Sequence, residues 1–224
     1  MGIEFEAKFL EIDVKKMRKI LLENGAKRVH KKKVYKRAIF LRCDESVPGF
    51  SRVRKEGKDT TMTIKILSNP KYPQEFEINI KDSFETGVDF MSALGIKKKA
   101  FQESIREKWS HPLAHELTFD TMPGLPTYME IDCTSEENLN KLIELFGLEI
   151  EKKRFGTFDY TYLEYYGIPK DVINDQTPSI TFANIQNEIK PSKNLELFEK
   201  ICTEHNKIAQ NIMKKKNKKN DKKK

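Results

Sequence analysis

The sequence predicts an α+β fold in which an antiparallel sheet has one charged face and one apolar face, with helices on the apolar face; the sheet is either open, with its charged face in water, or closed around a charged lumen. Two observations support this prediction. Short segments alternate apolar with charged residues, as strands with one polar face do. Between them lie amphipathic segments that begin at a capping residue and end at a glycine, as helices do. The order of helix, glycine and basic extended segment occurs three times, which indicates a repeated unit.

The first strand is expected at the N-terminus. Its apolar face is Ile3, Phe5, Ala7 and Phe9, and its charged face is Glu4, Glu6 and Lys8. Asp13 can then cap a helix that Gly25 ends, and a strand follows from Arg28. The same plan recurs with Ser83, Gly95 and a strand over 101–109, and again with Ser135, Gly147 and a strand over 150–158.

Several apolar and aromatic residues are interpreted as packing residues. Trp109 is expected in the core, and Cys133 on the apolar outer face of its strand because it has the parity of Ile131. The aromatic residues from Phe155 to Tyr166 are interpreted as a final strand with half of its rings buried.

The main domain is expected to span residues 1–166. Residues 167–192 contain three prolines and are interpreted as a linker or arm. Residues 193–213 have the spacing of an amphipathic helix, and 214–224 are expected to form a disordered, Lys-rich tail. This tail carries +7 of the formal net charge of +8, so the rest of the chain is nearly neutral.

Composition also bounds the setting and the partners. The apolar runs are far shorter than the roughly 20 residues that span a bilayer, so no membrane partner is expected. Cys43, Cys133 and Cys202 are odd in number and widely spaced, which indicates neither a disulfide framework nor a zinc site. We expect a reducing, cytoplasmic setting; the oligomeric state stays open.

The charged strand positions indicate chemistry. They are paired carboxylates or paired cations, segregated strand by strand, and a closed sheet would bring them into one lumen. Carboxylates from several strands suit Mg²⁺ or Mn²⁺, and opposed Arg and Lys side chains suit phosphate oxygens. The sequence therefore predicts a polyphosphate clamp. It contains no GxxxxGK[ST], HExxH or GxSxG motif.

A series of short motifs, in a fixed order along the chain, resembles that of a known family. In chain order they are Glu4-Phe5-Glu6-Ala7-Lys8, Arg52-Val53-Arg54, Thr63-Ile64-Lys65, Glu75-Phe76-Glu77, Phe101 with Arg106 and Trp109, Asp120 to Gly124, and Glu130-Ile131-Asp132. Over residues 1–166 this order resembles the CYTH domains of the triphosphate tunnel metalloenzyme superfamily. That superfamily includes thiamine triphosphatases, inorganic triphosphatases and class IV adenylyl cyclases.

The resemblance implies an eight-stranded antiparallel β-barrel, or tunnel, with a charged lumen and helices packed outside. It implies metal-site carboxylates at Glu4, Glu6, Glu130 and Asp132, of which Glu4, Glu6 and Glu130 are also assigned to catalysis. It implies a triphosphate cradle of Lys8, Arg52, Arg54, Lys65 and Arg106, with Lys152 or Arg154 adding a cation. Glu75 and Glu77 are expected either on the metal side or as partners of the cations.

The sequence departs from the family pattern at Ile66-Leu67, Pro73 and Ser104, where Gly-Pro, Arg and Lys are common in relatives. The expected activity is a metal-dependent triphosphatase acting on tripolyphosphate or a small organic triphosphate such as thiamine triphosphate. Tripolyphosphate is favoured because no separate signal for an organic head group is found. The alternatives are a class IV-type adenylyl cyclase, an RNA 5′-triphosphatase, for which the Lys-rich tail could retain RNA, and a polyphosphate-binding module without activity.

Overall fold

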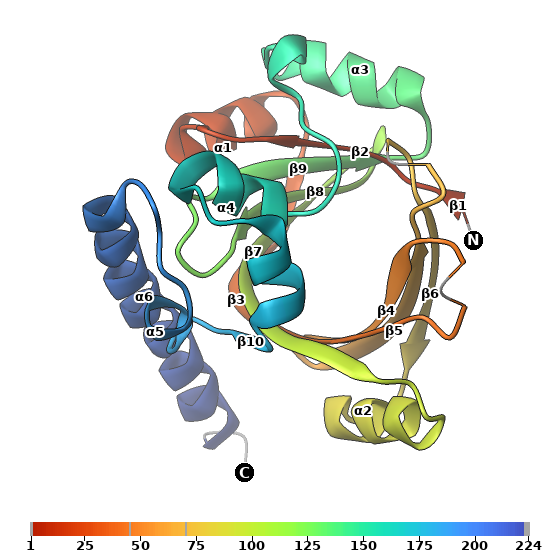
Figure 1. The fold of residues 1–224 in the computed structure, drawn as a ribbon. Helices are drawn as coiled ribbons and strands as arrows, with labels where there is room; N and C mark the ends of the chain where they lie inside the picture. The colour runs from red at the N-terminus through yellow and green to blue at the C-terminus, as the bar shows by residue number, and fades with distance from the viewer. Residues whose placement is uncertain (1, 45, 70, 222–224) are drawn as a thin grey trace.

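The computed structural model describes residues 2–44, 46–69 and 71–221, and its centre is a curled, antiparallel sheet (Figure 1). The strands are β1 (Gly2–Ile3), β2 (Phe5–Phe9), β3 (Lys27–Phe40), β4 (Gly49–Glu56), β5 (Asp59–Ile66), β6 (Gln74–Ile80), β7 (Lys98–His111), β8 (Ala114–Thr121), β9 (Tyr128–Cys133) and β10 (Ser179–Ile180). Their order is β1-β6-β5-β4-β3-β7-β8-β9-β2, and β10 pairs in parallel with β7.

The two edges of this sheet meet on one stretch of chain. The N-terminal segment pairs with β6 through Gly2 and Ile3, and with β9 through residues 5–9. The backbone N–H of Glu4, at the break between β1 and β2, donates to the carbonyl of Pro73 at 3.1 Å. The predicted α+β fold, with a curled antiparallel sheet and helices outside it, is confirmed.

Helices pack on the outside of the sheet (Figure 1). They are α1 (Val14–Glu23), α2 (Phe84–Ala93), α3 (Glu136–Leu145), α4 (Asp159–Tyr166), α5 (Ile185–Glu188) and α6 (Leu195–Asp221). Asp13, Ser83 and Ser135 cap the first three, each accepting a hydrogen bond from a backbone N–H three residues on, as predicted. Among the described helices, none combines the length and the apolar composition that crossing a bilayer requires.

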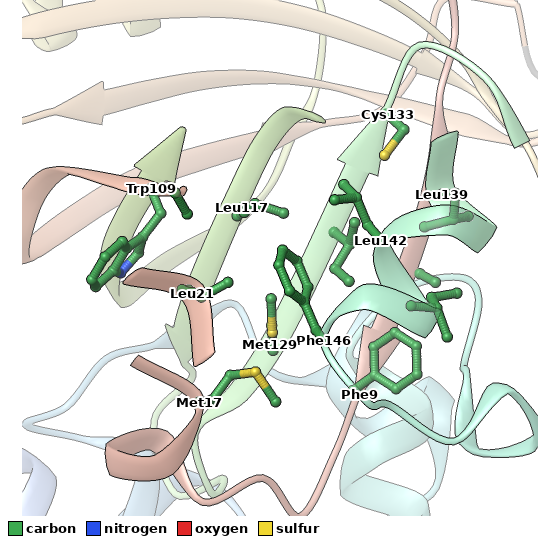
Figure 2. Close-up of a cluster of buried hydrophobic side chains, with 14 of the residues drawn as sticks. Phe9, Met17, Leu21, Trp109, Leu117, Met129, Cys133, Leu139, Leu142 and Phe146 are labelled. Carbon is green, nitrogen blue, oxygen red and sulfur yellow. The ribbon is translucent and has the colours of Figure 1, made fainter. Parts of the chain in front are cut away.

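The largest buried cluster joins α1 and α3 to the outer face of β2, β8 and β9 (Figure 2). Met17 and Leu21 lie on α1, Leu142 lies on α3, and Phe146 is the C-cap residue of α3. Trp109 packs in this cluster at 1% exposure, and its Nε1 donates to Glu107 at 3.0 Å. The packing roles predicted for Trp109 and Cys133 are confirmed. Apolar outer positions thus leave the inner face of these strands to the charged residues.

The prediction of a strand over residues 150–158 is wrong. Ile150–Lys152 is a 3-10 helix, Arg154 forms an isolated bridge with Lys8, and Asp159–Tyr166 is the helix α4. Tyr162 and Tyr166 are four residues apart, so they lie on one helix face. Their hydroxyl groups donate to the carbonyls of Pro123 and Gly124 at 2.5 and 2.6 Å. This buried pair stabilises a helix where alternation suggested a strand.

Residues 167–192, interpreted as a linker or arm, contribute side chains to a buried cluster. Ile173, Ile180 and Ile185 pack there with Tyr166 of α4 and Phe198 of α6. A π-helical turn, Val172–Gln176, and β10 lie within this segment. Helix α6 continues past residue 213 to Asp221, so it includes part of the Lys-rich run, and residues 222–224 lie outside the described residues.

Candidate functional site

The inner face of the curled sheet surrounds a cavity of about 340 Å³. Strand register explains which side chains reach it: Glu6 lies opposite Asp132, and Lys8 opposite Glu130, on β2 and β9. Since alternate residues share a face, these pairs and their i±2 neighbours point to the same side. Eleven residues that the sequence analysis assigned to the site line this cavity: Glu4, Glu6, Lys8, Arg52, Arg54, Lys65, Glu75, Glu77, Arg106, Glu130 and Asp132.

Two lysines lie among the carboxylates of β2 and β9. The Nζ of Lys8 is 3.1 Å from both Glu6 Oε1 and Glu130 Oε2. The Nζ of Lys65 is 2.5 Å from Glu4 Oε2 and 3.4 Å from Glu6 Oε1. Burial alone would raise the pKa of Glu130, but Lys8, followed by Arg106 and Lys65, lowers it to about 2. The lysines therefore keep this carboxylate ionised.

Arginines of β4 form an adjoining cationic wall. The Nη2 of Arg52 is 3.3 Å from Glu75 Oε1 and 3.4 Å from Glu77 Oε2. The Nη2 of Arg54 is 3.3 Å from Glu77 Oε2, which also accepts a hydrogen bond from Thr63 at 2.7 Å. In this arrangement Glu75 and Glu77 hold the guanidinium groups in place. Of the two roles left open for these glutamates, their contacts match the partner role.

Arg106 pairs with three carboxylates of the cavity. Its Nε and Nη2 donate to the two carboxylate oxygens of Asp120 at 2.8 and 2.5 Å. Its Nη1 donates to Glu116 at 2.5 Å, and its Nη2 lies 3.6 Å from Glu130. Although burial opposes its charge, Asp120 and Glu116 raise the pKa of Arg106. This guanidinium connects β7, β8 and β9 across the cavity wall.

Asp132 differs from the other acidic residues of the cavity. Among the described residues, no Lys, Arg or His nitrogen lies within 4.0 Å of its carboxylate. Burial, followed by the charges of Glu4 and Glu6, raises the pKa of Asp132 to about 8. Burial also raises the pKa of Glu4 to about 7, even though Lys65 acts to lower it. Without a cation Asp132 is therefore mostly protonated near neutral pH, and a cation bound at this end would favour its ionised form.

The donor set fits a hard divalent cation. Glu6 and Asp132 are directly paired across β2 and β9, and both present carboxylate oxygens to the cavity. Mg²⁺ commonly takes one or two protein carboxylates and completes its shell with water and phosphate oxygens. The described residues contain no ready group of three or more His, Cys, Asp or Glu ligands, since Lys8 and Lys65 contact Glu4, Glu6 and Glu130. A two-carboxylate site at Glu6 and Asp132, completed by substrate, is what these residues fit.

Comparison with solved structures identifies the architecture. A protein from Vibrio parahaemolyticus, proposed to be an adenylate cyclase, matches with a TM-score of 0.61 at 12% identity, over 71% of this chain and 97% of that one. A conserved hypothetical protein from Pyrococcus furiosus matches with a TM-score of 0.56 at 22% identity, over 67% and 94% of the two chains. The PH1819 protein from Pyrococcus horikoshii matches with a TM-score of 0.55 at 19% identity, over 72% and 98%.

The chain has the CYTH fold. At these identities the likeness shows a shared fold alone. No family model matches the sequence, and no curated protein does. The resemblance of the motif series to CYTH domains therefore agrees with the fold, and the chemistry must be argued from the cavity itself.

Two cations assigned from the resemblance do not reach the CYTH cavity. Lys152 lies on the 3-10 helix with a side chain that is 60% exposed, and it pairs with Glu149 at 2.6 Å. Arg154 pairs through its backbone with Lys8, but its half-exposed side chain lies 4.0 Å from Glu164 and lines a separate pocket. Both assignments depended on a strand at 150–158, which the structure lacks.

Other residues line the cavity although the sequence analysis did not assign them to it. They include Tyr35, Arg37, Gln102, Glu116, Asp120 and Tyr128. Asp120 was part of the motif series but was given no role. Tyr35 and Arg37 share the parity of Ile39 on β3, and this alternation is the signal that could have found them. The register shifts of β3 near Arg28 and His30 interrupt the pattern earlier in the same strand.

Proposed function

We propose that this protein is a divalent-metal-dependent triphosphatase that hydrolyses the terminal phosphate of inorganic tripolyphosphate or of a small organic triphosphate such as thiamine triphosphate. The observation that carries the proposal is one cavity that holds both a carboxylate pair, Glu6 and Asp132, and a wall of buried cations. A polyphosphate with its divalent cation has both charges, so it is complementary to both parts of the cavity.

The cations would bind the phosphate oxygens. Arg52, Arg54, Lys65 and Arg106 each contact a carboxylate at 3.7 Å or less, so each of these four cations has a carboxylate partner before substrate enters. Phosphate oxygens can accept from the same donors, and Arg can do so with two parallel hydrogen bonds. Substrate would therefore replace or share the carboxylate partners of these groups.

Mg²⁺ or Mn²⁺, when bound at Glu6 and Asp132, would screen the negative charge of the phosphate oxygens and polarise a water molecule. The fixed guanidinium groups would stabilise the charge that develops on the phosphoryl oxygens. The cavity wall would hold the chain of phosphates in one orientation while excluding most of the bulk water. Catalysis of this kind depends on positioning and charge, which is what the described side chains supply.

Phosphate release tests the proposal. Tripolyphosphate, thiamine triphosphate and ATP are each incubated with Mg²⁺ or Mn²⁺, and the parent protein is compared with Glu6→Ala. We expect metal-dependent release that falls at least about 100-fold in the variant, because Glu6 belongs to the metal-site pair. The control is Glu137→Ala, on the exposed face of α3, which should keep parental activity. Absence of release from all three substrates with either metal would contradict the proposal.

A second candidate is a class IV-type adenylyl cyclase. It is favoured by the Vibrio parahaemolyticus structure, which is described as a proposed adenylate cyclase. The same cavity would then bind ATP, with the ribose 3′-oxygen as nucleophile. Chromatography of the ATP reaction separates the two candidates: cyclic AMP with pyrophosphate indicates the cyclase, and ADP with phosphate indicates the hydrolase.

A further inference from the structure

Arg37 is the exception among the cations that line the cavity. It lies on β3, opposite Gln102 of β7 and Arg54 of β4. Within the described residues, every other Lys or Arg of the lining has a carboxylate oxygen within 4.0 Å, and Arg37 has none. The paired ones are Lys8, Arg52, Arg54, Lys65, Lys99 and Arg106.

Neutral groups hold the Arg37 guanidinium in place. Its Nη2 is 2.9 Å from the sulfur of Met122, and its central carbon lies 5.3 Å from the centroid of the Phe158 ring. Its Nε is buried and has no hydrogen-bond partner among the described residues. A buried charge without a partner is costly, and a thioether and an aromatic face offset only part of that cost. The side chain is thus oriented but not neutralised.

Neighbouring cations make this position more positive. Burial, together with the nearby charges of Arg52, Arg54 and Arg106, lowers the pKa of Arg37 to about 10. Arg37 therefore stays protonated at neutral pH. The three neighbouring guanidinium groups are paired with carboxylates, so Arg37 is the one whose donors are available to an incoming anion.

The unpaired Arg37 and the unpaired Asp132 lie on different parts of the sheet. Asp132 of β9 lies opposite Glu6 of β2 and Glu116 of β8. Arg37 lies on β3, on the other side of β7 from β8, where it is opposite Gln102 of β7. Among the described residues, the cavity thus has a carboxyl group without a cationic partner near the other β2 and β9 carboxylates and a guanidinium group without a carboxylate partner away from them. A polyphosphate that carries a cation at one end has the complementary polarity, with its cation toward Asp132 and its free phosphate toward Arg37.

We propose that Arg37 is a phosphate-binding residue that holds the end of a linear polyphosphate remote from the Glu6 and Asp132 carboxylates. The inference rests on the proposed function and deepens it, because it orients the substrate in the cavity. The Arg37 fork donates to the oxygens of the distal phosphate group, while Met122 and Phe158 fix its direction. A shorter anion held at the carboxylate end does not reach it, so Arg37 favours tripolyphosphate over pyrophosphate.

The test measures binding of tripolyphosphate and pyrophosphate by isothermal titration calorimetry of the full chain. Ca²⁺ is present in every titration as a hard divalent cation that takes carboxylate and phosphate oxygens. Arg37→Met is compared with the parent and with Arg28→Met, a matched control on the same strand whose side chain lies over Trp109 outside the cavity. We expect Kd for tripolyphosphate to rise about 10- to 100-fold in Arg37→Met, the usual effect of losing a charged hydrogen bond. Binding of pyrophosphate should weaken by less than about threefold in Arg37→Met, and binding of tripolyphosphate by less than about twofold in the Arg28→Met control.

Arg37→Lys provides a second variant, which keeps the charge but loses the fork, and it should bind tripolyphosphate with intermediate affinity. The thermal midpoint of ligand-free Arg37→Met should be at or above that of the parent, because an unpaired buried charge has been removed. Parental affinity for tripolyphosphate in Arg37→Met and Arg37→Lys overturns the proposal, and so does equal weakening of the two anions.

Turnover measured on the same preparations separates this inference from the proposed function. Hydrolysis by the parent, with affinity that does not depend on Arg37, contradicts only the role of Arg37. Binding that depends on Arg37, without hydrolysis in Mg²⁺ or Mn²⁺, contradicts the hydrolase and leaves Arg37 as a ligand of bound polyphosphate.

Discussion

Arg37 and Arg106 are both guanidinium groups in the wall of one cavity, but their surroundings give them opposite effects on stability. Arg106 contacts Asp120, Glu116 and Glu130; Glu116 and Glu130 also pair with Lys108 and Lys8, whereas Asp120 has no other cationic partner among the described residues. Arg37 contacts only a thioether and an aromatic ring among the described residues. The stability of the ligand-free protein is therefore expected to depend on Arg106 and not on Arg37.

Replacing Arg106 by Met should lower the free energy of unfolding by about 3 kcal/mol, because the buried carboxylate of Asp120 loses its cationic partner. Urea unfolding at pH 7 measures the change. Arg154→Met is the control, since its side chain is half exposed and lies 4.0 Å from its nearest carboxylate, and it should change stability by less than about 0.5 kcal/mol. Parental stability in Arg106→Met would show that the Arg106 network contributes nothing.

At the scale of residues, sequence predicts the face of a strand better than the contacts on it. Alternation placed Glu6 and Asp132 on the same side of the sheet, because side chains of a strand alternate with a period of two. It could not show that Lys8 pairs with Glu130 or that Arg37 pairs with no carboxylate. Those contacts depend on side-chain reach across strands that are far apart in the sequence.

At the scale of elements, α4 shows where a local pattern is ambiguous. Tyr160 and Tyr162 are two residues apart, as in a strand, while Tyr162 and Tyr166 are four apart, as in a helix. The carbonyls of Pro123 and Gly124, in the turn after β8, accept from the second pair. A distant turn therefore selects the helix, and no pattern within residues 150–166 contains that information.

Helix α6 carries a half-buried histidine that makes the protein sensitive to acid. His205 lies 5.9 Å from the ring of Phe182, centroid to centroid, and burial, followed by the charge of Lys32, lowers its pKa to about 4. The unfolded chain binds a proton at this residue near pH 6.5, whereas the folded chain resists it. The contribution of His205 to stability is therefore present above about pH 6.5 and is lost as the pH falls toward 4.

Urea unfolding of the parent and of His205→Gln, at pH 7.0 and pH 4.5, measures this effect. The parent should lose about 2 kcal/mol more than the variant between the two values, since Gln does not titrate. Equal losses in the two proteins would show that His205 is already protonated in the folded state.

At the scale of the whole molecule, the C-terminal segment is part of the packing that surrounds the cavity. Asn174 of the π-helical turn lines the cavity and donates to Asp159 of α4 at 3.1 Å. Phe198 and Cys202 of α6 contact the position of Gly124 so closely that an added Cβ would lie 2.6 Å from the Phe198 ring. Motif order predicted the curled sheet, but scattered prolines concealed how residues 167–192 are packed.

A chain that ends at residue 167 tests this organisation. It should be less stable than the full chain by at least about 5 kcal/mol, because several large apolar side chains lose their cover. The thermal midpoint and the fraction recovered in soluble form measure the change. A fragment as stable as the full chain would show that residues 1–166 form an independent domain and that the C-terminal segment is an addition to it.

The pairing of the N-terminal segment with both β6 and β9 has a consequence during synthesis. The strand over residues 5–9 can pair with β9 only when residues 128–133 have also left the ribosome, well over a hundred residues later. At roughly 5–20 residues per second, it waits on the order of ten seconds with its backbone groups unpaired. Pairing between such distant segments is slow, so the last step in building the lumen is expected to be docking of the N-terminus. Until then Glu6, on the N-terminal strand, is not paired with Asp132 of β9.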